Sequence, residues 1–351
     1  MKKRCYVRNV NVHLKFILNF QNTHMKKFAL APIALVFFFS CQTRTAKQEA
    51  IADETPVTSL TSRQCASQEV LEEQMAADPS LRQRMSDIEN FTRRTISSGQ
   101  LGRFVNGTME IPVVVNVVYN TAAENISDGQ IQSQIAVLNE DYQMLNADNT
   151  KVPANFAGVK GAMNIRFVLN SVVRKKTNKK SWGTNDAVKK SSLGGIDPTS
   201  PTTMLNMWSC NLGQSLLGYA QFPGGAPATD GVVILYSSFG SRAKFPGGTY
   251  IANYDLGRTA THEVGHWLNL RHIWGDATCG SDLVDDTPVH NTSNGGCPPA
   301  GHLSTCAGTP QEMWMNYMDY TYDACMYMFS QKQVDRMNAI FVTGGPRASF
   351  Q

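Results

Sequence analysis

The sequence predicts an α+β fold, with one twisted mixed sheet, a few helices and a loop-rich C-terminal part. Short β-branched runs alternate with helical periodicity between residues 110 and 270. The helix expected at 258–269 carries two histidines four residues apart. The last quarter of the chain holds four of the eight cysteines, in a stretch rich in Gly, Pro and Asp with little periodicity. With 351 residues, 42% hydrophobic and 17% charged, the chain is long enough for one or two domains with a substantial core.

The N-terminus is typical of an export signal. From Met25, MKKFALAPIALVFFFSC has two lysines and then an apolar run that is too short to span a bilayer but suits a secretory signal. Its end, Ser40 and Cys41, resembles a bacterial lipobox, in which Cys41 becomes the lipidated first residue; an uncleaved membrane anchor is the alternative. The segment before Met25 is polar and basic, so Met25 is a candidate for the true start. In either case we expect the rest of the chain to be exported, as an outer-membrane or cell-surface lipoprotein or in secreted form, where disulfides can form.

The predicted strands and helices follow in order. IPVVVNVVYN (111–120) is dense enough in β-branched residues for a buried strand. Ser127 and Gln130 form an S-x-x-Q capping box ahead of an amphipathic helix that ends near Leu145. Further strands are expected at 163–170, 217–225 and 231–238, and further helices at 258–269 and after a second capping box of Ser330 and Gln333.

The net charge of +4 is too mild to indicate a nucleic-acid partner. Much of the excess lies in a basic segment that we predict to be a solvated loop. Its residues are Arg174, Lys175, Lys176, Lys179, Lys180, Lys189 and Lys190.

The stretch HEVGHWLNLRH begins with His262 and predicts a metal site. His262 and His266 are four residues apart, so on a helix both imidazoles project from one face and can bind the same ion. Glu263 then lies close to the ion without binding it, where it can act as general base on a zinc-bound water and carry the proton to the leaving amine. The alternative is a solvated helix with two unrelated histidines.

His272 is the expected third ligand, and Asn269 is the residue that makes this possible. Six residues after His266, His272 cannot share the helical face, so the helix must end and the chain must turn back sharply. A left-handed residue does this, usually glycine, and asparagine is the best substitute because it tolerates positive φ. The stretch thus resembles the metzincin pattern H-E-x-x-H-x-x-G-x-x-H, with Asn269 in place of glycine.

A second, distant segment supports this interpretation. Metzincins place a methionine in a tight turn beneath the zinc, and NYMDYTYDACMYMF (316–329) resembles that turn, with Met318 as its methionine. Tyr320 matches a tyrosine that some metzincins place beside the metal, where it can stabilise the oxyanion of the tetrahedral intermediate. Core packing is the alternative for Met318 alone, since the chain has 15 methionines.

Together these segments resemble the pappalysin-like family of metalloproteases. The motifs are HEVGHWLNLRH, CGSDLVDDTP (279–288), NYMDYTYDACM (316–326) and LGYAQFP (217–223), in order within about 105–345. The resemblance implies a metzincin-like catalytic domain, a zinc cofactor, and protein or peptide substrates. It also implies the disulfides Cys279–Cys306 and Cys297–Cys325. The residues alone permit three pairings, and a zinc site of all four cysteines is disfavoured because no C-x-x-C pair is present.

The resemblance favours calcium in the neighbourhood of an acidic loop. An exported protein can use such a dense oxygen cluster for calcium, although this one is not an EF-hand, and an acidic turn capped by Asp286 is the alternative. The candidate ligands are Asp282, Asp285, Asp286 and Thr287.

Two further residues have candidate roles. Asp323, five residues after the turn methionine, is expected to wall the pocket for the residue after the scissile bond, where a carboxylate would favour Arg or Lys. Its alternative is a surface aspartate. Cys65, in SRQCASQ, can occupy the open position of the zinc and impose latency. A disulfide with Cys210 or a free thiol are the competing interpretations of Cys65, and Cys210 is expected to be a buried small residue.

The sequence therefore predicts an exported zinc endopeptidase that is made as a zymogen. We expect a signal or lipoprotein peptide at 1–41, a tether and pro-segment at 42–105 that is lost by cleavage near Arg94–Arg103, and a catalytic domain at 106–351. A monomer is expected, attached to a membrane only through its N-terminal lipid. A thermolysin-like enzyme is the runner-up and would need Glu312 as a ligand. A binding module with a structural zinc is the non-enzymatic alternative, and Glu263 argues against it.

Overall fold

The computed structural model describes residues 62–99 and 107–351. The predicted signal peptide, the lipidation site Cys41, the tether and Arg103 lie outside the described residues. Within 62–99 and 107–351, no helix is long and apolar enough to cross a membrane.

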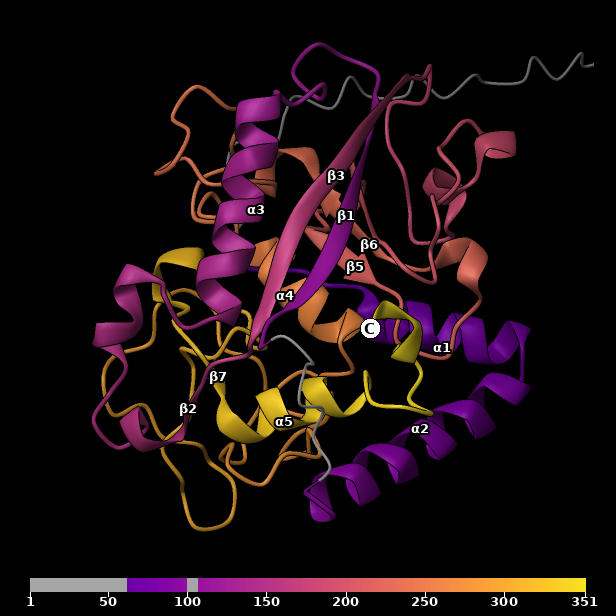
Figure 1. Cartoon of the computed structure of the whole chain (residues 1–351). Helices are drawn as coiled ribbons and strands as arrows, with labels where there is room; N and C mark the ends of the chain where they lie inside the picture. The colour runs from indigo at the N-terminus through magenta and orange to yellow at the C-terminus, as the bar shows by residue number, and fades with distance from the viewer. Residues whose placement is uncertain (1–61, 100–106) are drawn as a thin grey trace, which may run out of the picture. The chain divides into compact units, whose positions relative to one another are not determined.

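The larger sheet has five strands, in the order β3-β1-β4-β6-β5 (Figure 1). Neighbouring strands are parallel except β5, which pairs antiparallel with β6 at the edge. The bounds are Met109–Tyr119 for β1, Ile165–Lys176 for β3, Leu205–Cys210 for β4, Gly218–Ala220 for β5 and Val232–Leu235 for β6. The predicted twisted mixed sheet is thus confirmed, although β4 had not been expected as a strand. Cys210 is a buried residue at its end, as expected.

The core follows the alternation of β1. Ile111, Val113 and Val117 join a cluster with residues of two helices that pack on the sheet, whereas Val118 joins a second cluster with residues of β4, β5 and β6. Helix α3 (Asp128–Tyr142) packs against β3 and α4, and helix α4 (Arg258–Trp267) packs against β5 and β6. The sheet and α3 thereby fix the position of the helix that carries the histidines.

The segment before β1 forms two helices, α1 (Ser67–Ala77) and α2 (Ser80–Ser97). Leu71 of α1 and Leu81 of α2 bury against Phe222, which follows β5. Helix α2 also contacts the last long helix, α5 (Gln331–Ala339) (Figure 1).

The C-terminal part holds little regular structure beyond α5 and a small sheet of β2 (Lys160–Gly161) and β7 (Phe329–Ser330). Two disulfides connect its loops, Cys279–Cys306 and Cys297–Cys325, which are the pairs that the resemblance implies. A zinc site of four cysteines is therefore excluded, since all four are oxidised.

Two local predictions need correction. The basic segment is not a loop throughout, because Arg174 to Lys176 form the end of β3 and pair with Val117 to Tyr119 of β1. The capping box at Ser330 is complete, but at Ser127 only the serine acts as a cap. The side chain of Gln130 donates instead to the backbone carbonyls of Tyr236, Phe239 and Thr249, which follow β6.

Candidate metal centre and active site

The helix α4 ends where the sequence predicts. Asn269 adopts a left-handed conformation with φ of 76°. The amide of Leu270 donates to the carbonyl of Gly265 at 2.9 Å, and the amide of Asn269 donates to the carbonyl of His266 at 2.9 Å. This pattern of hydrogen bonds is a Schellman motif, which reverses the chain and returns His272 to the other two histidines.

The three Nε2 atoms converge, with 3.1 Å between His266 and His262 and 3.1 Å between His266 and His272. Each Nδ1 faces an acceptor. For His262 this is the Tyr317 carbonyl at 2.7 Å, and for His266 it is the Leu270 carbonyl at 2.8 Å. For His272 it is Asp276 Oδ1 at 2.5 Å. Because these acceptors fix the proton on Nδ1, the Nε2 lone pairs point at one another.

The environment keeps the imidazoles of His262 and His266 neutral. Burial and the neighbouring histidines hold the pKa of His262 and of His266 well below its usual value. Three lone pairs that converge in a buried space are unfavourable without a cation, and three imidazoles are a common ligand set for catalytic zinc. These residues therefore fit the metal that the sequence predicts.

Glu263 lies beside the histidines without joining them. A Cβ on Gly218 of β5 would come within 2.8 Å of Glu263 Cγ and Oε1, so only glycine leaves room for this carboxylate. Burial raises the pKa of Glu263 to about 7, and hydrogen bonds from Ser67 (2.8 Å) and Cys65 (3.3 Å) offset part of that rise. Such a pKa suits a group that must accept and return a proton near neutral pH.

The methionine turn supports the histidines from below. Met318 is fully buried and packs so closely on Gly265 of α4 that a Cβ there would come within 2.5 Å of its sulfur. Tyr320 places its ring 5.0 Å from that of His272, and its hydroxyl donates to the Cys65 carbonyl at 3.1 Å. Burial raises the pKa of Tyr320 well above its usual value, so its hydroxyl remains a donor.

Residues before α1 cover the site. Cys65 Sγ and the three histidine ligand atoms all lie within 4.8 Å of one another. The chain here adds to the open edge of β5: the Leu217 amide donates to the Gln64 carbonyl at 2.9 Å and the Ala66 amide donates to the Gly218 carbonyl at 3.1 Å. Cys65 and Cys210 are both free thiols, so they do not form a disulfide with each other.

Arg63 pairs with Asp323. Their side chains are 1% and 0% exposed and meet at 2.7 Å. The other carboxylate oxygen of Asp323 accepts from the amides of Leu256 (2.9 Å) and Arg258 (3.2 Å). Asp323 is thus a buried, oriented carboxylate and not a surface residue, and an arginine side chain fills the space in front of it.

The acidic loop divides into two groups. Asp282 is buried and accepts from the Thr287 hydroxyl at 3.0 and 2.9 Å. Asp286 instead accepts from Ser330 and from the amide of Lys332 at the start of α5, and the exposed Asp285 pairs with the Lys332 side chain. The structure therefore does not bring Asp285 and Asp286 to Asp282, because the N-terminus of α5 binds their carboxylates.

Some residues of the site could not be singled out from the sequence. Asp276, Ser67 and Arg63 are polar residues in unremarkable stretches of sequence. Only Asp276, four residues after His272, stands at a spacing that suggests a hydrogen-bond partner of a metal ligand. Glu312, which a thermolysin-like site would need, lies with His302 and Asn294 and is not among the ligand atoms that converge on the histidines.

Comparison with known proteins identifies the family. A family model described as Pregnancy-associated plasma protein-A matches residues 237–342, which include the three histidines and the methionine turn. An extracellular metalloprotease of Arthroderma benhamiae is 34% identical over 248 residues, covering 64% of this chain and 72% of that protein. The chain belongs to the pappalysin-like metalloproteases.

Solved pappalysin-like structures agree with the fold. Mature mirolysin of Tannerella forsythia in complex with a cleaved peptide is 48% identical, with a TM-score of 0.66, and the match covers 70% of this chain and 96% of that one. A promirolysin mutant of the same organism is 45% identical, with a TM-score of 0.73, and the match covers 82% of this chain and 97% of that one. This pappalysin-like chain is therefore a metalloendopeptidase with the metzincin fold of mirolysin.

Proposed function

We propose that this protein is an exported zinc endopeptidase, made as a zymogen, that cleaves before Arg or Lys. The observation that carries the proposal is the set of three buried Nε2 atoms that point at one another beside Glu263. Relatives named extracellular metalloproteases support export. The lipid on Cys41, the start at Met25 and a monomeric state remain part of the proposal.

The reaction assigns a task to each polar group. Zinc, held by His262, His266 and His272, would supply a Lewis acid that polarises the scissile carbonyl and acidifies a water. Glu263 accepts the proton of the attacking water and returns it to the leaving amine. Tyr320, whose hydroxyl already donates to a backbone carbonyl over the site, stabilises the oxyanion of the intermediate.

The test is cleavage of casein and of arginine-containing peptides by the processed enzyme, with and without a chelator. We expect cleavage that the chelator abolishes and that Glu263→Gln lowers by at least about a hundredfold. Glu110→Gln, at a glutamate on β1 that is 57% exposed, is the matched control and should keep full activity. Undiminished cleavage by Glu263→Gln would contradict the role of Glu263 as general base.

The preference for Arg or Lys after the scissile bond is proposed from the pair of Arg63 and Asp323. The pro-segment carries its own arginine against this carboxylate, at the distance of a charge-assisted hydrogen bond. A substrate side chain with the same charge can replace it once the pro-segment is gone. Peptides with Arg, Lys, Gln or Glu at that position should be cleaved in decreasing order, and equal cleavage of the Arg and Gln peptides would contradict the proposal.

Latency is proposed to depend on Cys65. With its thiol among three histidines, four ligands would close the zinc site and leave no place for a water. Cys65→Ala should therefore speed autoprocessing, whereas Cys210→Ala, at the other buried thiol, should not. An unchanged rate for Cys65→Ala would count against the switch. The promirolysin structure supports a precursor form in the family.

Calcium is proposed for Asp282 and Thr287 alone. A buried carboxylate and a hydroxyl within 3.0 Å of it, in a loop of an exported protein, are oxygen donors suited to this ion. Burial raises the pKa of Asp282 to about 7.

A further inference from the structure

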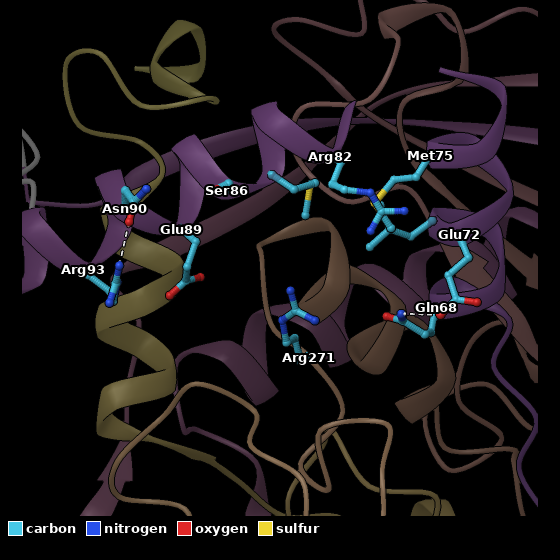
Figure 2. Close-up of a pocket in the computed structure, with 11 residues that line it drawn as sticks. Gln68, Glu72, Met75, Arg82, Ser86, Glu89, Asn90, Arg93 and Arg271 are labelled. Atoms are coloured by element: carbon cyan, nitrogen blue, oxygen red, sulfur yellow. Dashed lines mark hydrogen bonds between the residues drawn. The ribbon is translucent and has the colours of Figure 1, made fainter. Parts of the chain in front are cut away.

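Arg271 stands between the second and third histidines, on the loop that follows α4. Its side chain lines a cavity of about 660 Å³ whose other walls belong to α1 and α2. Figure 2 shows the Arg271 guanidinium directed into this space, with Glu89 of α2 on one side and Glu72 of α1 on the other. Within residues 62–99 and 107–351, Arg271 forms no hydrogen bond or ion pair of its own, so its charge is available.

The catalytic part already binds one carboxylate of the pro-segment at this place. Arg336 of α5, whose side chain is 3% exposed, donates to both oxygens of Glu89 at 2.5 and 3.2 Å. The Nε of Arg336 donates to the Asn269 carbonyl at 2.8 Å, which orients the guanidinium. Glu89 and Arg271 line the same cavity. Two arginines of the catalytic part thus face acidic residues of α1 and α2.

The order of contacts along the pro-segment shows which part of a substrate would replace these residues. Arg63 lies at Asp323, Cys65 lies at the histidines, and the Arg271 cavity begins only at Gln68. A substrate with an arginine at Asp323 has its scissile bond at the histidines. The residues before that bond then extend over the side where α1 now lies, toward Arg271.

We propose that Arg271, with Arg336 beside it, recognises an acidic side chain of the substrate a few residues before the scissile bond. Loss of the pro-segment removes Glu89 and Glu72 and leaves two guanidinium groups without a carboxylate from it. Loss of the pro-segment also uncovers these groups for a substrate, and a carboxylate matches guanidinium geometry. This inference rests on the proposed endopeptidase function and adds a second determinant of specificity to Asp323.

The experiment compares matched pairs of fluorogenic peptides on the processed, zinc-loaded enzyme. Each peptide has arginine after the scissile bond and either Glu or Gln at one of the second to sixth positions before it. At one position we expect kcat/KM to be about tenfold higher for Glu than for Gln, the effect of one charge-assisted hydrogen bond, and the ratio to fall at high salt. Because each ratio is measured on one enzyme preparation, partial loss of zinc does not alter it.

Variants locate the effect. Arg271→Gln should bring the Glu-to-Gln ratio to about one, and Arg271→Glu should favour a lysine peptide over the glutamate peptide at the same position. Arg166→Gln, at an arginine of β3 that is 57% exposed, is the control and should keep the ratio. A ratio near one at all positions in the unaltered enzyme, or one that Arg271→Gln leaves in place, would overturn the inference while peptide cleavage continues. Absence of any chelator-sensitive cleavage would instead overturn the proposed function.

Discussion

Replacing Arg63 by alanine should release the pro-segment from the site. In the zymogen its guanidinium donates to Asp323 at 2.7 Å and to Thr259 at 3.0 Å, and both charged side chains are buried. Breaking a buried ion pair by removing one partner costs about 3 kcal/mol or more, because the remaining charge stays uncompensated. Since 1.4 kcal/mol is a factor of ten, the open fraction of the zymogen should rise about a hundredfold.

The thiol of Cys65 reports this opening. In the zinc-loaded full chain, with Glu263→Gln to prevent processing, alkylation of Cys65 requires the pro-segment to leave. Mass spectrometry can follow Cys65 and Cys210, the two free thiols of residues 62–99 and 107–351, in the same sample. Arg63→Ala should speed alkylation of Cys65 by about a hundredfold, as derived from the ion pair, and leave that of Cys210 unchanged.

Matched variants complete the experiment. Arg82→Ala, at an exposed arginine of α2, should have no effect on Cys65. Asp323→Asn added to Arg63→Ala should return the alkylation rate part of the way to that of the unaltered chain, because it removes the buried charge that Arg63→Ala leaves uncompensated. If Arg63→Ala alkylates no faster than Arg82→Ala, the buried pair does not hold the pro-segment in place and the reasoning is refuted.

Three other predictions concern the metal sites and the oxyanion. His272→Ala should lose most of the bound zinc in metal analysis because only two imidazoles remain, and full retention would contradict the third ligand. Tyr320→Phe should lower kcat by about a hundredfold and leave KM nearly unchanged, as expected for a donor that acts in the transition state. A hundredfold rise in KM with unchanged kcat would exclude that role. Added calcium should raise the Tm of the unaltered protein through binding to the folded state, and Asp282→Asn should abolish the rise; the same rise in the variant would remove Asp282 from the site.

The centre of the site could be predicted from the sequence because its determinants are local. Helical spacing places His262 and His266 on one face, and turn chemistry explains why Asn269 can end the helix with φ of 76°. The contacts across the fold could not be predicted. Gly218 reads as an ordinary strand glycine until α4 is packed on β5, and Arg63 reads as one basic residue among many until the chain brings it to a residue 260 positions away.

The acidic loop is a second case in which contacts across the fold could not be predicted from the sequence. Asp282, Asp285 and Asp286 stand within five positions, and composition alone suggests that their carboxylates act together. The helix α5 lies beside this loop, and its first turn binds Asp286 through the Lys332 amide at 2.9 Å. Such a choice between partners depends on tertiary packing, which a single sequence does not reveal.

The open edge of β5 affects how the processed enzyme behaves in concentrated solution. Departure of the pro-segment exposes the amide of Leu217, the carbonyl of Gly218 and the amide of Ala220, which now bond to Gln64, Ala66 and Ser67. Unpaired strand edges invite pairing between copies, and short strands limit this hazard. With only three residues, β5 offers a peptide enough main-chain contacts to bind but gives a second copy little edge to extend. Until cleavage, the pro-segment occupies these main-chain groups, so neither a peptide nor a second copy can pair with them.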